Sequence, residues 1–233
     1  MNDRAPTRPT LAIFDLDHTL LDGDSDQLWC SFLIDEGVLD GARFAARNAQ
    51  MEQGYRDGTV SVQAFCDFYI GTLAGRSPAQ WQPLRDRFVQ ACVLPRLHAG
   101  ARGLLDTHRR QGHRLLLSTA TNRFLTEPTA AALGVDALIG TECELGADGC
   151  FTGRALGLPN MRDGKVARLQ AWLAAQGQAL ADLHTVFYSD SMNDLPLLEQ
   201  VTEAVVTHGE PRLQALAAQR GWRCISLEPK DPR

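Results

Sequence analysis

The sequence lacks several features that would place it in a common class. No apolar run approaches the roughly 18 residues that a membrane-spanning helix needs. The formal net charge is −5 and no basic run is present, so a nucleic-acid partner is not indicated. The six cysteines include no CxxC pair, which favours reduced thiols in a cytoplasm over a zinc site or a disulfide framework. Residues 1–10 are polar and contain two prolines, which predicts a short disordered lead without a signal-peptide segment.

What is present is the pattern of an α/β protein. With 233 residues, 44% of them hydrophobic, the chain is long enough for one large domain or for a core with a smaller appendage. After one strand near Leu11, residues 27 to about 94 carry only helical patterns, and strands then alternate with helices. We therefore predict a doubly wound parallel sheet formed by residues 1–21 and 95–233, with a helical cap of residues 22–94 inserted after the first strand. The oligomeric state is left open.

The first strand runs directly into two carboxylates. Leu11-Ala-Ile-Phe14 reads as a buried strand, and Asp15 and Asp17 follow it. In open α/β sheets ligands bind at the carboxyl ends of the strands, and side chains two apart on an extended chain share a face. Two anions this close repel each other unless a cation or a shared proton compensates. The stretch therefore predicts a hard, oxygen-liganded cation such as Mg²⁺.

Three further polar clusters follow predicted strands or begin helices. Ser118 follows Leu115-Leu-Leu117, Lys165 follows Asp163-Gly164, and Asp190 and Asp194 follow the strand that ends at Tyr188. Each alone has a structural explanation as a strand end, a helix cap or a solvated charge. Together they supply a carboxylate nucleophile, a proton-transfer carboxylate, a hydroxyl and an ammonium for phosphate oxygens, and metal ligands.

The order and type of these clusters resemble the haloacid dehalogenase superfamily of aspartate-nucleophile phosphatases. The closest branch is subfamily IB, which is phosphoserine-phosphatase-like and histidinol-phosphatase-like, and the resemblance extends from about residue 11 to 226. It implies the following roles: Asp15 as nucleophile, Asp17 as general acid and base, Ser118, Lys165 and Asn193 as phosphate-binding residues, and Asp15, Asp190 and the Asp17 backbone carbonyl as Mg²⁺ ligands supported by Asp194. The chain departs from the family at Ser189, where glycine is common.

The resemblance also implies a small phosphorylated metabolite as substrate, because the cap covers the crevice. Known substrates in the branch include phosphoserine and histidinol phosphate, which both carry an ammonium group. Asp22, Asp24 and Asp26 could pair with such a cation, or could form a solvated acidic loop that caps a helix. Candidates for binding a substrate carboxylate are Arg43, Arg47 and Arg56. We favour histidinol phosphate; the alternatives are phosphoserine or another phosphomonoester, a phosphotransferase, and a phosphate-binding module without turnover.

Overall fold

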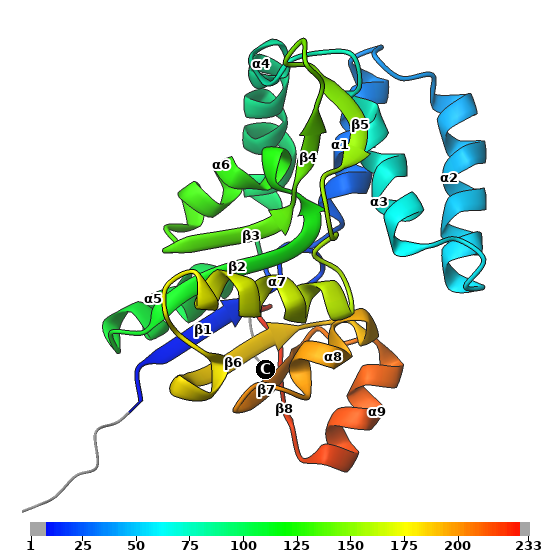
Figure 1. Cartoon of the computed structure of the whole chain (residues 1–233). Coiled ribbons are helices and arrows are strands. Elements are labelled where there is room, and N and C mark those ends of the chain that lie inside the picture. Colours follow the sequence, from blue (N-terminus) through cyan, green and yellow to red (C-terminus); the bar gives the residue numbers. More distant parts are fainter. Residues whose placement is uncertain (1–7, 229–233) are drawn as a thin grey trace, which may run out of the picture.

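The computed structural model describes residues 8–228, and its core is a six-stranded parallel sheet with the order β3-β2-β1-β6-β7-β8 (Figure 1). The strands are β1 (Thr10–Phe14), β2 (Arg114–Asn122), β3 (Ala137–Thr141), β6 (His184–Ser189), β7 (Glu203–Thr207) and β8 (Arg223–Ile225). The predicted parallel, doubly wound sheet is confirmed. Most of the predicted disordered lead lies outside the described residues, and Thr10 already belongs to β1.

Helices cover both faces of this sheet because alternate strand residues point to opposite sides. Ala12 and Phe14 pack into one apolar cluster, whereas Leu11 and Ile13 pack into another. The first cluster includes residues of α5 (Ala101–Arg110) and α6 (Arg123–Leu133). The second includes residues of α7 (Asp163–Ala174), α8 (Leu195–Leu198) and α9 (Pro211–Arg220). Short turns η4 (Leu180–Asp182) and η5 (Met192–Asp194) flank β6.

The chain between β1 and α5 forms the helical cap. Its helices are α1 (Ser25–Asp35), α2 (Gly41–Arg56), α3 (Val62–Ile70) and α4 (Pro78–Phe88), followed or joined by the short turns η1 (Gly71–Leu73), η2 (Val89–Val93) and η3 (Leu94–Arg96). Each of the four helices begins after an Asp or Ser whose side chain accepts a backbone N–H, namely Asp24, Asp40, Ser61 and Ser77. Trp29 packs against Trp81 and Phe88, with ring centroids 5.6 and 5.2 Å away, so these tryptophans serve packing.

A hairpin from the core completes the cap. Strands β4 (Cys143–Leu145) and β5 (Phe151–Ala155) rise from the sheet beside the cap helices (Figure 1). The Ala155 N–H donates to Asp67 Oδ1 of α3 at 2.7 Å, and the Gly75 N–H donates to the Phe151 carbonyl at 2.9 Å. The sequence indicates this hairpin but not where it docks. The cap is therefore attached to the core by the hairpin as well as by its two linkers.

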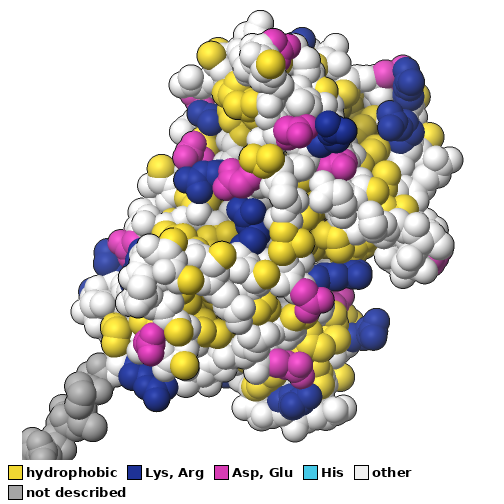
Figure 2. All heavy atoms as spheres, viewed as in Figure 1, with side chains coloured by type: hydrophobic (Ala, Val, Ile, Leu, Met, Phe, Trp, Pro, Cys, Tyr) yellow, Lys and Arg dark blue, Asp and Glu magenta, His cyan; other side chains and the backbone are white. Residues whose placement is uncertain are grey.

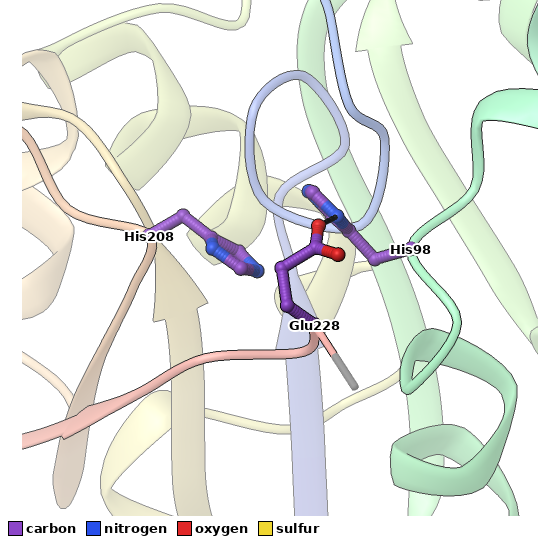
Figure 3. Close-up of side chains that lie close together, drawn as sticks. All are labelled: His98, His208 and Glu228. Carbon is purple, nitrogen blue, oxygen red and sulfur yellow. Dashed lines mark hydrogen bonds and ion pairs between the residues drawn. The ribbon is translucent and has the colours of Figure 1, made fainter. Parts of the chain in front are cut away.

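The two linkers pair with each other, and the C-terminal segment is fastened to them. Leu21 and Leu97 form an antiparallel bridge. Beside it, His98 Nδ1 lies 2.6 Å from Glu228 Oε1 (Figure 3). The Leu227 N–H donates to His208 Nε2 at 3.0 Å. The ligand atoms of these two histidines and Glu228 lie within 4.8 Å of one another. However, the rings stack at 4.1 Å with planes only 20° apart, so their in-plane lone pairs do not converge on one metal ion. We interpret the group as a hydrogen-bonded fastening.

Charged side chains of both signs are scattered over the face seen in Figure 2, without a patch of one sign. Among residues 8–228, no helix combines the length and the apolar character that crossing a bilayer requires.

A buried polar network supports the two strands that lead into the predicted site. Phe14 and Tyr188 stack with ring centroids 5.0 Å apart. His108 of α5 packs edge-on against Phe14, and its Nε2 lies 2.8 Å from the Tyr188 hydroxyl. Burial, together with the neighbouring His113 and Arg223, lowers the pKa of His108 to about 4, although Glu203 opposes this. His108 is therefore neutral in the folded protein at ordinary pH.

This network predicts an acid-sensitive part of the folding free energy. The unfolded chain protonates His108 below its ordinary pKa of about 6.5, whereas the folded chain does so only near 4. Stability contributed by neutral His108 is therefore present above pH 6.5 and lost as the pH falls toward 4, by about 2 kcal/mol after allowing for solvent screening. We expect the free energy of unfolding, measured with urea at several pH values in this range, to fall less steeply with decreasing pH for His108→Gln than for the wild type. The same pH dependence of the unfolding free energy in both proteins would contradict the role of His108.

Candidate active site

The predicted acidic residues meet at the carboxyl edge of the sheet. β1 pairs with β6, and the Asp15 N–H donates to the Tyr188 carbonyl at 3.0 Å, so Asp15 and Asp190 leave neighbouring strands side by side. Thr19 Oγ1 lies 3.1 Å from Asp15 Oδ2 and 3.2 Å from Asp190 Oδ1. One hydroxyl thus lies within hydrogen-bond distance of both carboxylates, which converge on the same point.

Lys165 is the buried cation of this group. Its Nζ lies 2.9 Å from Asp15 Oδ1 and 2.8 Å from an Asp194 carboxylate oxygen, and the residue is only 2% exposed. The preceding glycine permits this placement. A Cβ on Gly164 would lie 2.1 Å from the Pro159 carbonyl oxygen, so only glycine lets α7 begin close enough to aim Lys165 at the sheet edge.

The group carries more negative than positive charge. Burial raises the pKa of Asp15 to about 7, against the pull of Lys165 and with the repulsion of Asp194 and Asp17. Burial and the repulsion of Asp15 and Asp194 raise the pKa of Asp190 to about 8. Burial alone would lower the pKa of Lys165, but its two carboxylate partners keep it above the ordinary value. A divalent cation beside Asp15 and Asp190 would relieve this repulsion, and hard carboxylate oxygens are what Mg²⁺ prefers. The donor set therefore fits the predicted ion.

Asp17 is held from the cap and from β2. Its Oδ1 accepts the Ser25 N–H at the start of α1 at 2.7 Å, a position where the helix dipole favours an anion. Its Oδ2 lies 3.2 Å from Thr119 Oγ1 and 3.0 Å from Thr121 Oγ1. The carboxylate is thus fixed by the first cap helix and by two hydroxyls of a core strand.

Ser118 lies apart from these carboxylates. Its Oγ accepts the Asn160 Nδ2 at 3.1 Å, and Asn160 also donates to the Thr119 and Ile139 carbonyls. Neither Ser118 nor Thr119 lines the cavity at the sheet edge, whereas Thr121 does; Thr119 differs from Ser118 in its contact with Asp17. Neighbouring strand residues point to opposite faces, so the hydroxyls that face the carboxylates come from the next residues. Its predicted phosphate contact stays a prediction that the geometry does not favour.

The residue that departs from the family pattern has a role in the structure. The Ser189 hydroxyl donates to Asp194 Oδ2 at 2.7 Å, and the Ser191 N–H donates back to Ser189 Oγ at 3.2 Å. Ser189 therefore orients Asp194, which also contacts Lys165. Asn193, one residue earlier, lines the cavity beside Asp190.

The cavity has a volume of about 160 Å³ and an acidic, partly aromatic lining. Besides the residues above, Asp24, Asp26, Phe65, Tyr69 and Met161 line it. Burial and the nearby Asp17 raise the pKa of Asp24 to about 7, and burial with Asp24 and Asp17 raises the pKa of Asp26. Asp26 Oδ1 is buried and has no hydrogen-bond partner within residues 8–228. Of the three candidate acids, Asp22 lies on the exposed linker and does not line the cavity.

The three candidate arginines lie elsewhere. Arg43, Arg47 and Arg56 are exposed on α2, and the residues that line the cavity include no arginine within the described part of the chain. Sequence reasoning missed the site contacts of Thr119, Thr121 and Asn160. Thr119 and Thr121 follow Ser118, whose hydroxyl was predicted at the strand end, and the alternation of side chains along a strand could have pointed to them. No sequence pattern points to Asn160.

Comparisons with known proteins agree with this geometry. The family model of haloacid dehalogenase-like hydrolases matches residues 12–199. A histidinol-phosphatase of Neisseria meningitidis is 36% identical over 219 residues, covering 94% of this chain and 99% of that protein. A phosphoserine phosphatase of Mycobacterium tuberculosis is 30% identical over 214 residues, covering 91% of this chain and 68% of that protein.

Solved structures show the same fold. A Bordetella pertussis Tohama I protein of unknown function has a TM-score of 0.89 and 41% identity, covering 95% of this chain and 100% of that chain. A substrate-bound phosphoserine phosphatase has a TM-score of 0.66 at 16% identity, covering 94% and 93%, and shares the fold. The resemblance inferred from the motifs is confirmed: the chain belongs to the haloacid dehalogenase-like hydrolase family.

Proposed function

We propose that the protein is a Mg²⁺-dependent phosphomonoesterase that hydrolyses histidinol phosphate through an aspartyl-phosphate intermediate. Asp15 and Asp190, with the Asp17 backbone carbonyl, would hold the ion, and Asp194 would support them through Lys165. When bound, Mg²⁺ supplies positive charge that offsets the phosphate oxygens and the carboxylates. A cytoplasmic location is part of the proposal, and the six free cysteines are consistent with it. Residues 22–94 remain our proposed limits of the cap domain.

The chain's own residues account for both half-reactions. An Asp15 carboxylate oxygen attacks phosphorus, a bond to phosphorus forms, and the ester P–O bond breaks as Asp17 protonates the leaving alkoxide. Asp17, now a carboxylate, takes a proton from water, whose oxygen attacks phosphorus and releases Asp15. Lys165 holds phosphate oxygens and favours the ionised form of Asp15 against the effect of burial. We assign the hydroxyl contact with phosphate to Thr119 or Thr121, because these reach Asp17 (3.2 and 3.0 Å).

The substrate assignment depends on the charge of the cavity wall. A phosphoserine substrate presents a carboxylate as well as an ammonium, and the carboxylate needs a cationic partner. The cavity lining instead includes Asp24, Asp26 and the aromatic side chains of Phe65 and Tyr69. Arg162, near the rim, is committed to Tyr55 and Asn193. Histidinol phosphate has an ammonium and an imidazole and no carboxylate, so acids and aromatic rings suit it.

Two alternatives use the same residues. A phosphotransferase would pass the phosphoryl group from Asp15 to an acceptor other than water, and adding candidate acceptors would yield a new phosphoester. A binding module without turnover is disfavoured because Asp17, the proton-transfer carboxylate, is present and held by three hydrogen-bond donors.

The reaction is tested by phosphate release from a panel that contains histidinol phosphate, phosphoserine and p-nitrophenyl phosphate, an ester whose organic group carries no charge. Release is expected with Mg²⁺ and is expected to stop with a chelator. Asp15→Asn and Asp17→Asn should each abolish turnover, because one loses the nucleophile and the other the transferable proton, while circular dichroism confirms that both fold. Turnover by Asp17→Asn at the wild-type rate would refute its role.

The substrate assignment is tested by charge removal in the cavity wall. Asp26→Asn is expected to lower kcat/KM for histidinol phosphate by roughly 10- to 150-fold, the effect of a lost charge-assisted hydrogen bond. Hydrolysis of p-nitrophenyl phosphate should change less than about threefold, because that ester has no cation. Asp24→Asn is the matched variant of the neighbouring acid: it removes the charge but keeps the cap of α1, since Asn caps a helix as well as Asp. Equal losses on both esters would argue against a cation-binding wall.

A further inference from the structure

Three side chains join the cap to the core at the rim of the cavity, and we call this contact set the cap latch. Tyr55 is the penultimate residue of α2, Arg162 directly precedes α7, and Asn193 lies in η5. The Tyr55 hydroxyl donates to Asn193 Oδ1 at 3.1 Å, and Arg162 Nε donates to the same oxygen at 3.2 Å. The Arg162 guanidinium also lies 4.5 Å from the centre of the Tyr55 ring. The latch thus joins one cap helix to the start of α7, which carries Lys165, and to the turn after β6, which follows Asp190.

These contacts fix which way the Asn193 amide faces. An arginine Nε is only a donor, so the atom it meets must be the amide oxygen. With Oδ1 held by Tyr55 and Arg162, Nδ2 and its two N–H groups are turned the other way. Asn193 lines the cavity together with Asp190 and Asp194, so Nδ2 is the donor that this side chain can offer to phosphate oxygens there.

The backbone of Arg162 is held in a conformation that side-chain-bearing residues rarely adopt. Its φ is 53° and its ψ is −128°, a combination that glycine adopts far more readily. Arg162 lies three positions before Lys165, and in this conformation its guanidinium lies over the ring of the cap residue Tyr55. Such an outlier persists only where its surroundings hold it; here the side chain contacts Tyr55 and Asn193, and the carbonyl accepts the Lys165 N–H at 3.0 Å.

We propose that Tyr55 and Arg162 are positioning residues, which act through Asn193 by turning its Nδ2 toward the phosphoester when the cap is closed. The inference rests on the proposed phosphatase function. It predicts that the Tyr55 hydroxyl matters for phosphate binding and turnover only while Asn193 is present. A hydroxyl that merely stabilised the fold would have the same effect with or without Asn193.

A double-mutant cycle tests this coupling with p-nitrophenyl phosphate, which avoids dependence on the substrate assignment. Tyr55→Phe alone is expected to lower kcat/KM roughly three- to tenfold, as for a lost neutral hydrogen bond, and Asn193→Ala roughly 10- to 150-fold. In the Asn193→Ala background, Tyr55→Phe should have no further effect. The dissociation constant of inorganic phosphate, measured by calorimetry in the presence of Mg²⁺, should rise in each single variant. Tyr55→Phe should raise it no further in the Asn193→Ala background. Tyr188→Phe is the matched control: its lost hydroxyl contacts His108 and not Asn193, so its effect on kcat/KM should be the same with and without Asn193.

A second pair of variants separates positioning from stability. Arg162→Ala and Arg162→Gly both delete the guanidinium, but only glycine relieves the backbone strain. We expect equal losses of kcat/KM, with a melting temperature about 2–4 °C higher for the glycine variant. The inference would be overturned if kcat/KM of the Arg162 variants followed their melting temperatures, or if the effects of Tyr55→Phe and Asn193→Ala were additive. In either case the wild type would still hydrolyse phosphomonoesters. A wild type that hydrolyses no ester on the panel would instead overturn the proposed function.

Discussion

The structure depends on one buried ammonium that faces a surplus of carboxylates. Lys165 contacts Asp15 and Asp194, and Asp190 approaches Asp15 through Thr19. Burying such a group costs desolvation free energy that the ion pairs only partly recover, so the surrounding chain has to hold it in place. Gly164 lets α7 approach the sheet, and Ser189 holds Asp194. The cluster is a source of reactivity more than of stability.

Much of this was predictable because it follows from strand order and burial. Apolar runs at Leu11–Phe14 and Thr185–Tyr188 are buried in neighbouring parallel strands, and parallel strands end at the same edge. Any polar residues that follow them must meet there. Asp15, Asp17 and Asp190 therefore could be placed from sequence, and Lys165 could be placed once the resemblance supplied its role.

The remaining features depend on tertiary geometry. Ser118 and Thr119 differ by one position in a strand, and which of them faces the carboxylates is set by how β2 pairs with its neighbours, where the β2–β3 register shifts between Ser118 and Asn122. Arg47 lies on α2, a helix that buries none of its residues completely, so a helical pattern alone does not say which side faces the cavity. The docking of the β4–β5 hairpin on α3 likewise involves contacts between distant segments, such as that of Ala155 with Asp67.

The surplus of negative charge connects chemistry with selectivity. Asp15 and Asp190 repel each other, and this repulsion favours a divalent cation between them. The same sign of charge continues along the wall at Asp24 and Asp26, where Asp26 Oδ1 is buried without a partner in the described chain. An anionic organic group would add to this repulsion, whereas a cationic one would relieve it. For the proposed phosphatase, a phosphomonoester would enter such a cavity most favourably with its phosphate at Lys165 and the proposed metal ion, and with a positively charged group at its other end.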